Sequence, residues 1–299
     1  YFFELTPSAF SRQPILDAGY YYRWATQLAF GGFRFTENFS GNPLYPYFVA
    51  GLIRFLNAGP ALIRLIQHLL GVLTCLMIFE AGRKIFRPAA ALIGALLYAV
   101  FVPALFYEGW ILSASLSAFL TAAVLTCLTG AETRGRWFGG GILAGILILG
   151  RPSLIPVGIL IWLIWKAGRG KSLGTAGMIA VFAGGLILAL LPFSLQYYLH
   201  HREFVLISPH GGENFYIGNR PGAIGLGQMP EFARGMPELQ RRDFRAEAER
   251  RTGTRFSPAQ SSRYWFRQAF AFITHHPLRF IKLFGLKIYF FFCGTDFSD

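Results

Sequence analysis

The chain has 299 residues, of which 54% are hydrophobic and only 14% are charged, and its mean hydropathy is +0.42. These values exclude an ordinary soluble domain and predict an all-α polytopic membrane protein. The net charge of +13 comes from Lys and Arg in short clusters between apolar runs. This pattern argues against nucleic acid as a partner and favours anionic lipid headgroups or phosphorylated lipids.

The spacing of the cysteines and the sequence at the two chain ends indicate what kinds of site and of chain to expect. Cys75, Cys127 and Cys293 follow no CxxC spacing, which argues against a disulfide framework or a zinc site. The chain opens without a methionine, shows no signal peptide and stops at G-T-D-F-S-D. We therefore expect a fragment of a longer protein, with a preceding span lost.

Residues 1–60 are expected to form a first outer loop with interfacial helices, in which the first half is loop and a short helix covers the second half. P-I-L-D-A-G-Y-Y-Y-R-W-A at residues 14–25 and G-N-P-L-Y-P-Y-F at residues 41–48 are aromatic and punctuated by Gly and Pro. The apolar run at residues 44–55 is too short to span and contains Arg54, so it is expected in the interface. Asp17 among these rings indicates either a site at the water–lipid boundary or an aromatic belt with one solvated acid.

Residues 61–199 are predicted to form six membrane spans. One helix over residues 137–165 would be about 45 Å long, beyond a hydrocarbon core of ~30 Å, and it would bury Arg151. Two helices meeting at Arg151 and Pro152 avoid both problems. The basic clusters then share one side, as the positive-inside rule requires, with Asp17, Glu108 and Arg151 on the other. The expected spans are residues 61–80, 89–106, 111–129, 137–150, 152–165 and 175–197, and the clusters are residues 83–87, 134–136 and 166–171.

The C-terminal third is predicted to be an outer soluble insertion at residues 200–276, followed by a basic interfacial helix at 277–299. Residues 210–225 are dense in turn residues and are expected to be a loop. Residues 237–250 are typical of a solvated charged helix. Ser257 and Gln260 form a capping-box pattern that opens a helix to about residue 275. The run at 278–292 is short and one-sidedly basic, which favours an interfacial helix.

Several stretches resemble one family of membrane glycosyltransferases. They are D-A-x-x-Y at residue 17 with P-L-Y-P at 43, the runs at residues 64–86 and 141–154, N-F-Y-I-G-N-R-P at 214–221, and S-P-A-Q with H-P-L-R-F near the end. Together they resemble the GT-C fold, in the branch of dolichyl-phosphate-mannose protein mannosyltransferases and aminoarabinose transferases found in bacteria. The resemblance covers nearly the whole chain, and its specificity comes from the order and spacing of the stretches.

The resemblance implies sugar transfer from a polyprenyl-phosphate donor to a lipid, glycan or protein acceptor at the outer, periplasmic side of the inner membrane. In that family an acid of the first outer loop is the catalytic base, and Asp17 occupies its place. A carboxylate there accepts the proton of the acceptor hydroxyl, and direct attack inverts the anomeric centre. Cations stabilise the leaving phosphate and aromatic rings cover the substrate. The implied substrate-binding residues are Tyr20, Tyr45, Arg151, His210, Asn214, Asn219, Arg220 and Lys287.

One family position departs from the pattern. Where many members read S-E-S-L, this chain reads S-A-S-L with Ala114, and its acid is Glu108. Glu108 therefore either serves the same catalytic role or is a solvated loop acid. His210 is either a loop hydrogen-bonding residue or, with Glu108, a metal ligand. No metal residues are assigned, and a divalent metal stays open as a cofactor. Gln67 and His68 are expected to make polar contacts between helices.

Two other functions stay open at this stage. A lipid-linked sugar transporter would also need outer cations and aromatic rings, but it would show internal repeats, and no convincing repeat is visible. A non-catalytic membrane subunit would leave Asp17 dispensable.

Overall fold

The computed structural model describes residues 16–32, 42–129, 133–154 and 175–293, and these residues form helices and no strand. They fall into two compact units. Unit 1 comprises the described residues up to Ile207, and unit 2 comprises those from Ser208 on. The predicted all-α architecture is confirmed for the described residues, and each unit is considered by itself.

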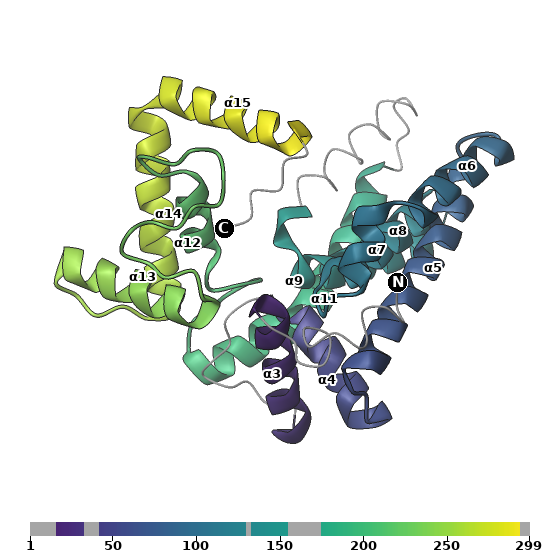
Figure 1. Ribbon diagram of the computed structural model, residues 1–299, viewed down its shortest axis with the longest axis horizontal. Helices are drawn as coiled ribbons and strands as arrows, with labels where there is room; N and C mark the ends of the chain where they lie inside the picture. Colours follow the sequence, from purple (N-terminus) through teal and green to yellow (C-terminus); the bar gives the residue numbers. More distant parts are fainter. Residues whose placement is uncertain (1–15, 33–41, 130–132, 155–174, 294–299) are drawn as a thin grey trace. The chain divides into compact units, whose positions relative to one another are not determined.

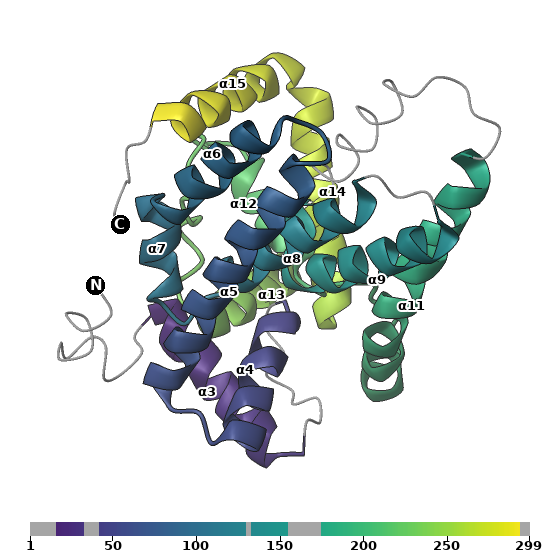
Figure 2. The same cartoon turned by 90° about the vertical axis from the view of Figure 1, so that its right-hand side faces the viewer.

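Unit 1 is a bundle of apolar helices. Helix α5 contacts α6, α7 and α8, and α8 packs in turn on α9, which lies along α11. Helix α3 lies beside α4, and α4 also touches α9 (Figures 1 and 2). The helices are α3 (Leu16–Phe30), α4 (Leu44–Leu56), α5 (Pro60–Gly82), α6 (Pro88–Ala99), α7 (Val102–Glu108), α8 (Ala114–Leu128), α9 (Arg134–Gly150) and α11 (Thr175–His201), with a 3₁₀ turn at Pro152–Leu154.

Two described helices are long and apolar enough to cross a membrane, Pro60–Gly82 and Gly177–His201. Helices α6 and α7 make a third span if they count as one, although they are bent by 52°. The sequence predicted a continuous span there. The helix breaks at Phe101 because Pro103, in the first turn of α7, supplies no backbone N–H. The predicted segment at 152–165 and the basic cluster at 166–171 lie largely or wholly outside the described residues, so the six-span count stays a prediction.

The predicted break at Arg151 is confirmed. Helix α9 ends at Gly150, Arg151 caps it with a non-helical backbone, and its N–H donates to the Leu147 carbonyl. At the opposite end of the bundle, Lys84 and Arg136 both donate to the carbonyl of Thr126, at 3.4 and 3.2 Å. Two of the predicted basic clusters therefore share one end of unit 1, and α9 runs from that end to Arg151.

Helices α9 and α11 approach each other closely through glycines. A Cβ at Gly141 would lie 2.0 Å from the Phe182 carbonyl oxygen, and one at Gly185 would lie 2.3 Å from that of Phe138. Gly145 likewise leaves room for Ala189. Small residues at a helix contact let the backbones meet, which is how helices associate in lipid, where burial of apolar surface supplies no driving force.

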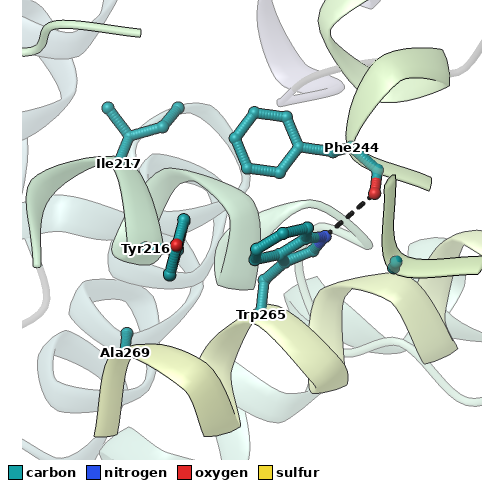
Figure 3. Close-up of a cluster of buried hydrophobic side chains, with 6 residues drawn as sticks. Tyr216, Ile217, Phe244, Trp265 and Ala269 are labelled. Atoms are coloured by element: carbon teal, nitrogen blue, oxygen red, sulfur yellow. Dashed lines mark hydrogen bonds between the residues drawn. The ribbon is translucent and has the colours of Figure 1, made fainter. Parts of the chain in front are cut away.

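Unit 2 contains α12 (Gly211–Gly218), α13 (Pro237–Thr252), α14 (Pro258–His275) and α15 (Pro277–Cys293). Its core is aromatic, and Trp265 stacks on Phe232. Trp265 also meets Phe244 edge-on, and its indole N–H donates to the Phe244 carbonyl at 3.1 Å (Figure 3). Tyr216, Ile217 and Ala269 close the cluster. Unit 2 therefore has a hydrophobic core of its own.

The structure confirms some sequence predictions for individual helices and corrects others. The capping box of Ser257 and Gln260 is present, and the charged, amphipathic and basic helices are found at α13, α14 and α15. Two expected loops are helical instead. Residues 16–30 form α3, and residues 211–218 form α12 because Gly212 and Glu213 are bound to α14.

Candidate functional site

The first turn of α4 is the centre of a polar cluster in unit 1. Tyr45 lies there with 1% of its surface exposed, and its hydroxyl donates to the Gln67 side-chain carbonyl on α5. The Gln67 amide nitrogen donates to two backbone carbonyls, Glu108 at 2.8 Å and Trp110 at 2.7 Å. Gln67 thus fixes the start of α4 and the end of α7 to one helix, as expected for a polar contact between helices.

Glu108 is a buried acid and is not the solvated loop acid that the sequence left open. It is 4% exposed, and its Oε2 lies 2.9 Å from His68 Nδ1. Its carboxylate occupies space that exists because residue 71 is glycine: a Cβ there would lie 2.1 Å from Glu108 Oε1. The pair satisfies the rule that buried charges are paired and hydrogen-bonded. Whether Glu108 has a catalytic role stays a prediction.

Asp17 is exposed in the first turn of α3, where the positive end of the helix dipole stabilises a carboxylate. Tyr20, Tyr21 and Trp24 follow at i+3, i+4 and i+7, so the four side chains share one helix face. Tyr21 meets the Tyr45 ring edge-on, with centroids 5.4 Å apart. The face that begins with Asp17 is therefore directed toward the first turn of α4.

Arg151 lies at the same end of unit 1. A Cβ at Gly150 would lie 2.8 Å from Leu44 Cδ2, so the end of α9 meets the residue just before Tyr45. Arg151 itself is exposed. All the predicted site residues of unit 1 thus gather around the start of α4: Asp17, Tyr20, Tyr45, Glu108 and Arg151.

Sequence reasoning missed one cation in this cluster. Arg64 lies in the first turns of α5, is 7% exposed, and has no carboxylate partner among the described residues. A buried guanidinium with no carboxylate beside it is unfavourable near a helix N-terminus, because the free N–H groups there already carry positive charge. The available signal was an arginine four residues into an apolar run, next to Gln67 and His68.

In unit 2 the structure brings two predicted residues together. The Lys287 ammonium of α15 donates to the Asn219 side-chain oxygen at 2.9 Å, and partial burial lowers the pKa of Lys287. Arg220 donates to the carbonyls of Pro221, Gln228 and Met229, which closes the loop after α12.

His210 also lies in unit 2, with its Nδ1 3.3 Å from Glu213 Oε2. Ser261 donates to the other Glu213 oxygen at 3.2 Å. The described residues contain no group of three or more His, Cys, Asp or Glu that would hold a metal ion. Metal binding by His210 and Glu108, which belong to different units, stays a prediction.

Comparison with known proteins identifies the family. The dolichyl-phosphate-mannose-protein mannosyltransferase family matches residues 40–197, more than half of the chain. The chain belongs to this family. No curated protein and no solved structure matches it.

As a member of this mannosyltransferase family, the chain is an integral membrane glycosyltransferase with a polyprenyl-phosphate-linked sugar as its donor. The apolar helices of unit 1 agree with this assignment. The matched residues include Tyr45, Arg64, Gln67, Glu108 and Arg151. Asp17 and the predicted residues of unit 2 lie outside the match, so their roles rest on the geometry and on the resemblance.

Proposed function

We propose that the protein transfers a sugar from a polyprenyl phosphate to an acceptor hydroxyl on the outer side of the membrane, with Asp17 as the general base. The observation that carries the proposal is the placement of Asp17. It heads the aromatic face of α3 that reaches Tyr45, at the end of unit 1 opposite the basic residues Lys84 and Arg136. The positive-inside rule assigns that basic end to the cytoplasm.

The reaction is a single displacement. The acceptor oxygen forms a bond to the anomeric carbon while the bond from that carbon to the phosphate oxygen breaks. The proton of the acceptor hydroxyl goes to the Asp17 carboxylate, and the electron pair of the broken bond leaves with the lipid phosphate. Attack from the face opposite the leaving group inverts the anomeric configuration.

The leaving phosphate needs cations. Arg151 stands at the end of α9 beside the start of α4, and its guanidinium offers a bidentate fork to a phosphate. Arg64 is a buried cation of the same cluster, and an anion would compensate its charge. Arg220 and Lys287 of unit 2 are further candidates for contacts to the donor, and Asn219 would orient Lys287.

Asp17→Asn tests the proposal in cells that lack the gene and carry a plasmid copy. The amide keeps the size of the side chain but takes no proton, so transfer should fall by about 10²–10⁴-fold. Mass spectrometry of lipid-linked sugars and of glycosylated acceptors should then show donor accumulation and acceptor loss, as in cells without the gene. The level of folded protein in the membrane should not change.

Two control variants make the test specific. Asp17→Glu keeps a carboxylate and should retain part of the activity. Glu80→Gln removes a partly exposed acid that is bonded to Arg83 and should change nothing. If Asp17→Asn turned over normally, Asp17 would be only a solvated acid within an aromatic belt at the membrane surface. A donor that accumulates on one face of the membrane, with no loss of transfer in lysed cells, would favour the transporter.

A further inference from the structure

One face of helix α15 is covered by none of the described residues of unit 2. Five large apolar side chains on it are 47–81% exposed: Leu278, Ile281, Phe284, Ile288 and Tyr289. Their spacing of three, three, four and one residues places them on one side of a helix. On the other side Leu283 is buried, and Leu286 and Phe290 lie against Gly225, so α15 is held to unit 2 by its opposite face.

The exposed face is not a part of the core of unit 2. That core is built by α12, α13 and α14 around Trp265. Helix α13 differs from α15, because acids and bases alternate along it, as is typical of a helix exposed to water. An apolar face of this size on a unit with a complete core marks a surface that contacts something other than water.

The charges of α15 identify the partner. The helix contains no acid, and Lys282, one turn after Leu278, is exposed at the edge of its apolar face. Long basic side chains at the edge of an apolar helix face extend toward headgroups while their stems stay in the apolar layer. We infer that α15 docks unit 2 flat onto the surface of a bilayer that contains anionic lipids.

A transmembrane course for α15 fits the structure less well. Lys287 near its C-terminal end is bound to Asn219, so one side of the helix is occupied by polar protein contacts. If the proposed function holds, docking also brings Asn219 and Lys287 to the depth of a lipid phosphate, but the docking itself does not depend on that function.

Depth measurements on the whole chain in nanodiscs test the inference. In a background with Cys75, Cys127 and Cys293 replaced by serine, nitroxide labels are placed singly at Ile281→Cys, Ile288→Cys and Arg245→Cys. Arg245 is exposed on α13 and serves as the matched control. With phosphatidylglycerol present, labels at 281 and 288 should collide with oxygen more than with a water-soluble nickel chelate, whereas the label at 245 should show the reverse.

A charge variant tests the lipid preference. Lys282→Gln removes one charge near the surface, which should lower the ratio of docked to undocked helix about fivefold. Arg245→Gln should leave that ratio unchanged.

Two results would overturn the inference. One is access of the nickel chelate to positions 281 and 288. The other is spin–spin broadening between copies, which would make the occupant a second chain. Asp17→Asn protein should dock normally, so loss of transfer and loss of docking are distinguishable.

Discussion

The two units hold their helices together in different ways. In unit 1, α9 and α11 meet through Gly141, Gly145 and Gly185, where backbone lies against backbone. In unit 2, α13 and α14 meet through large rings, with Trp265 between Phe232 and Phe244. The difference agrees with the surroundings predicted for the units, lipid for unit 1 and water for most of unit 2. In lipid, burying an apolar ring gains no hydrophobic free energy, so close backbone contact stabilises the helix pair. In water, burying the ring is favourable.

The division is not absolute. At the contact of α12 and α14, a Cβ on Gly212 would lie 1.8 Å from the Ser262 carbonyl oxygen, so unit 2 also contains a close glycine contact. It is combined there with hydrogen bonds from Gly212 N–H to Ser262 and from Ser261 to Glu213. Unit 2 thus uses aromatic burial for most of its stability and a glycine contact only where α12 must approach α14.

Among substitutions that would test this difference between the units, Trp265→Ala should have the largest effect on stability. Removing a fully buried tryptophan leaves a cavity and takes away the indole donor to the Phe244 carbonyl, and the expected loss of stability is about 3–5 kcal/mol. Hydrogen exchange measured by mass spectrometry should speed up in α12, α13 and α14 and stay unchanged in α9 and α11. Phe270→Ala on the same helix, where the ring is 54% exposed, should have a much smaller effect. Equal acceleration in both units would show that they share one cooperative core.

Gly141→Ala should have the next largest effect, and in unit 1. One methyl group would collide with the Phe182 carbonyl, and overpacking of this kind costs about 1–3 kcal/mol. Thermal unfolding in detergent and hydrogen exchange of α9 and α11 would measure it. Gly135→Ala on the same helix is the matched control, because no atom outside its own helix turn lies within 4 Å of the place that the added methyl group would take. If both substitutions are neutral, the glycines do not hold the pair together.

The sequence predicted best what local patterns determine. Ser257 and Gln260 define a helix start by themselves, and Pro152 after an arginine ends α9 whatever surrounds it. The sequence failed where tertiary contacts decide. Residues 211–218 contain three glycines, which favour a loop, but Gly212 and Glu213 gain bonds to α14 that stabilise the helix. Residues 16–30 were also expected to be loop, because the clustered tyrosines obscured the helical spacing from Asp17 to Trp24.

The candidate site was predictable only in part. The resemblance indicated Asp17, Tyr45 and Arg151, and the structure places them at one end of unit 1. The burial of Glu108 against His68 was not predictable, because it depends on the space that Gly71 leaves on another helix. Nor does a sequence show that Arg64 is buried without a carboxylate partner among the described residues.

The smallest expected effect concerns an ion pair on the surface of unit 2. Glu247 accepts hydrogen bonds from Arg250 and Arg251 at 2.7 Å, and these bonds, Arg250 first, lower the pKa of Glu247 to about 2. An unfolded glutamate has a pKa of about 4.3. The folded state therefore binds the proton more weakly, and the stability that the pair contributes is full above about pH 4.3 and is lost as the pH falls toward 2.

Glu247→Gln should accordingly lower the stability of unit 2 at neutral pH by less than either substitution above, because the Arg250 side chain is largely exposed and water screens it. The difference in unfolding midpoint between wild type and variant should shrink between about pH 4.3 and pH 2, and taking the difference cancels other groups such as Asp243. Glu231→Gln, which removes an exposed acid of the same unit, is the control variant. A constant difference across that range would mean that Glu247 contributes through packing beside Arg251, which lies over the Trp265 ring at 5.2 Å, and not through its charge.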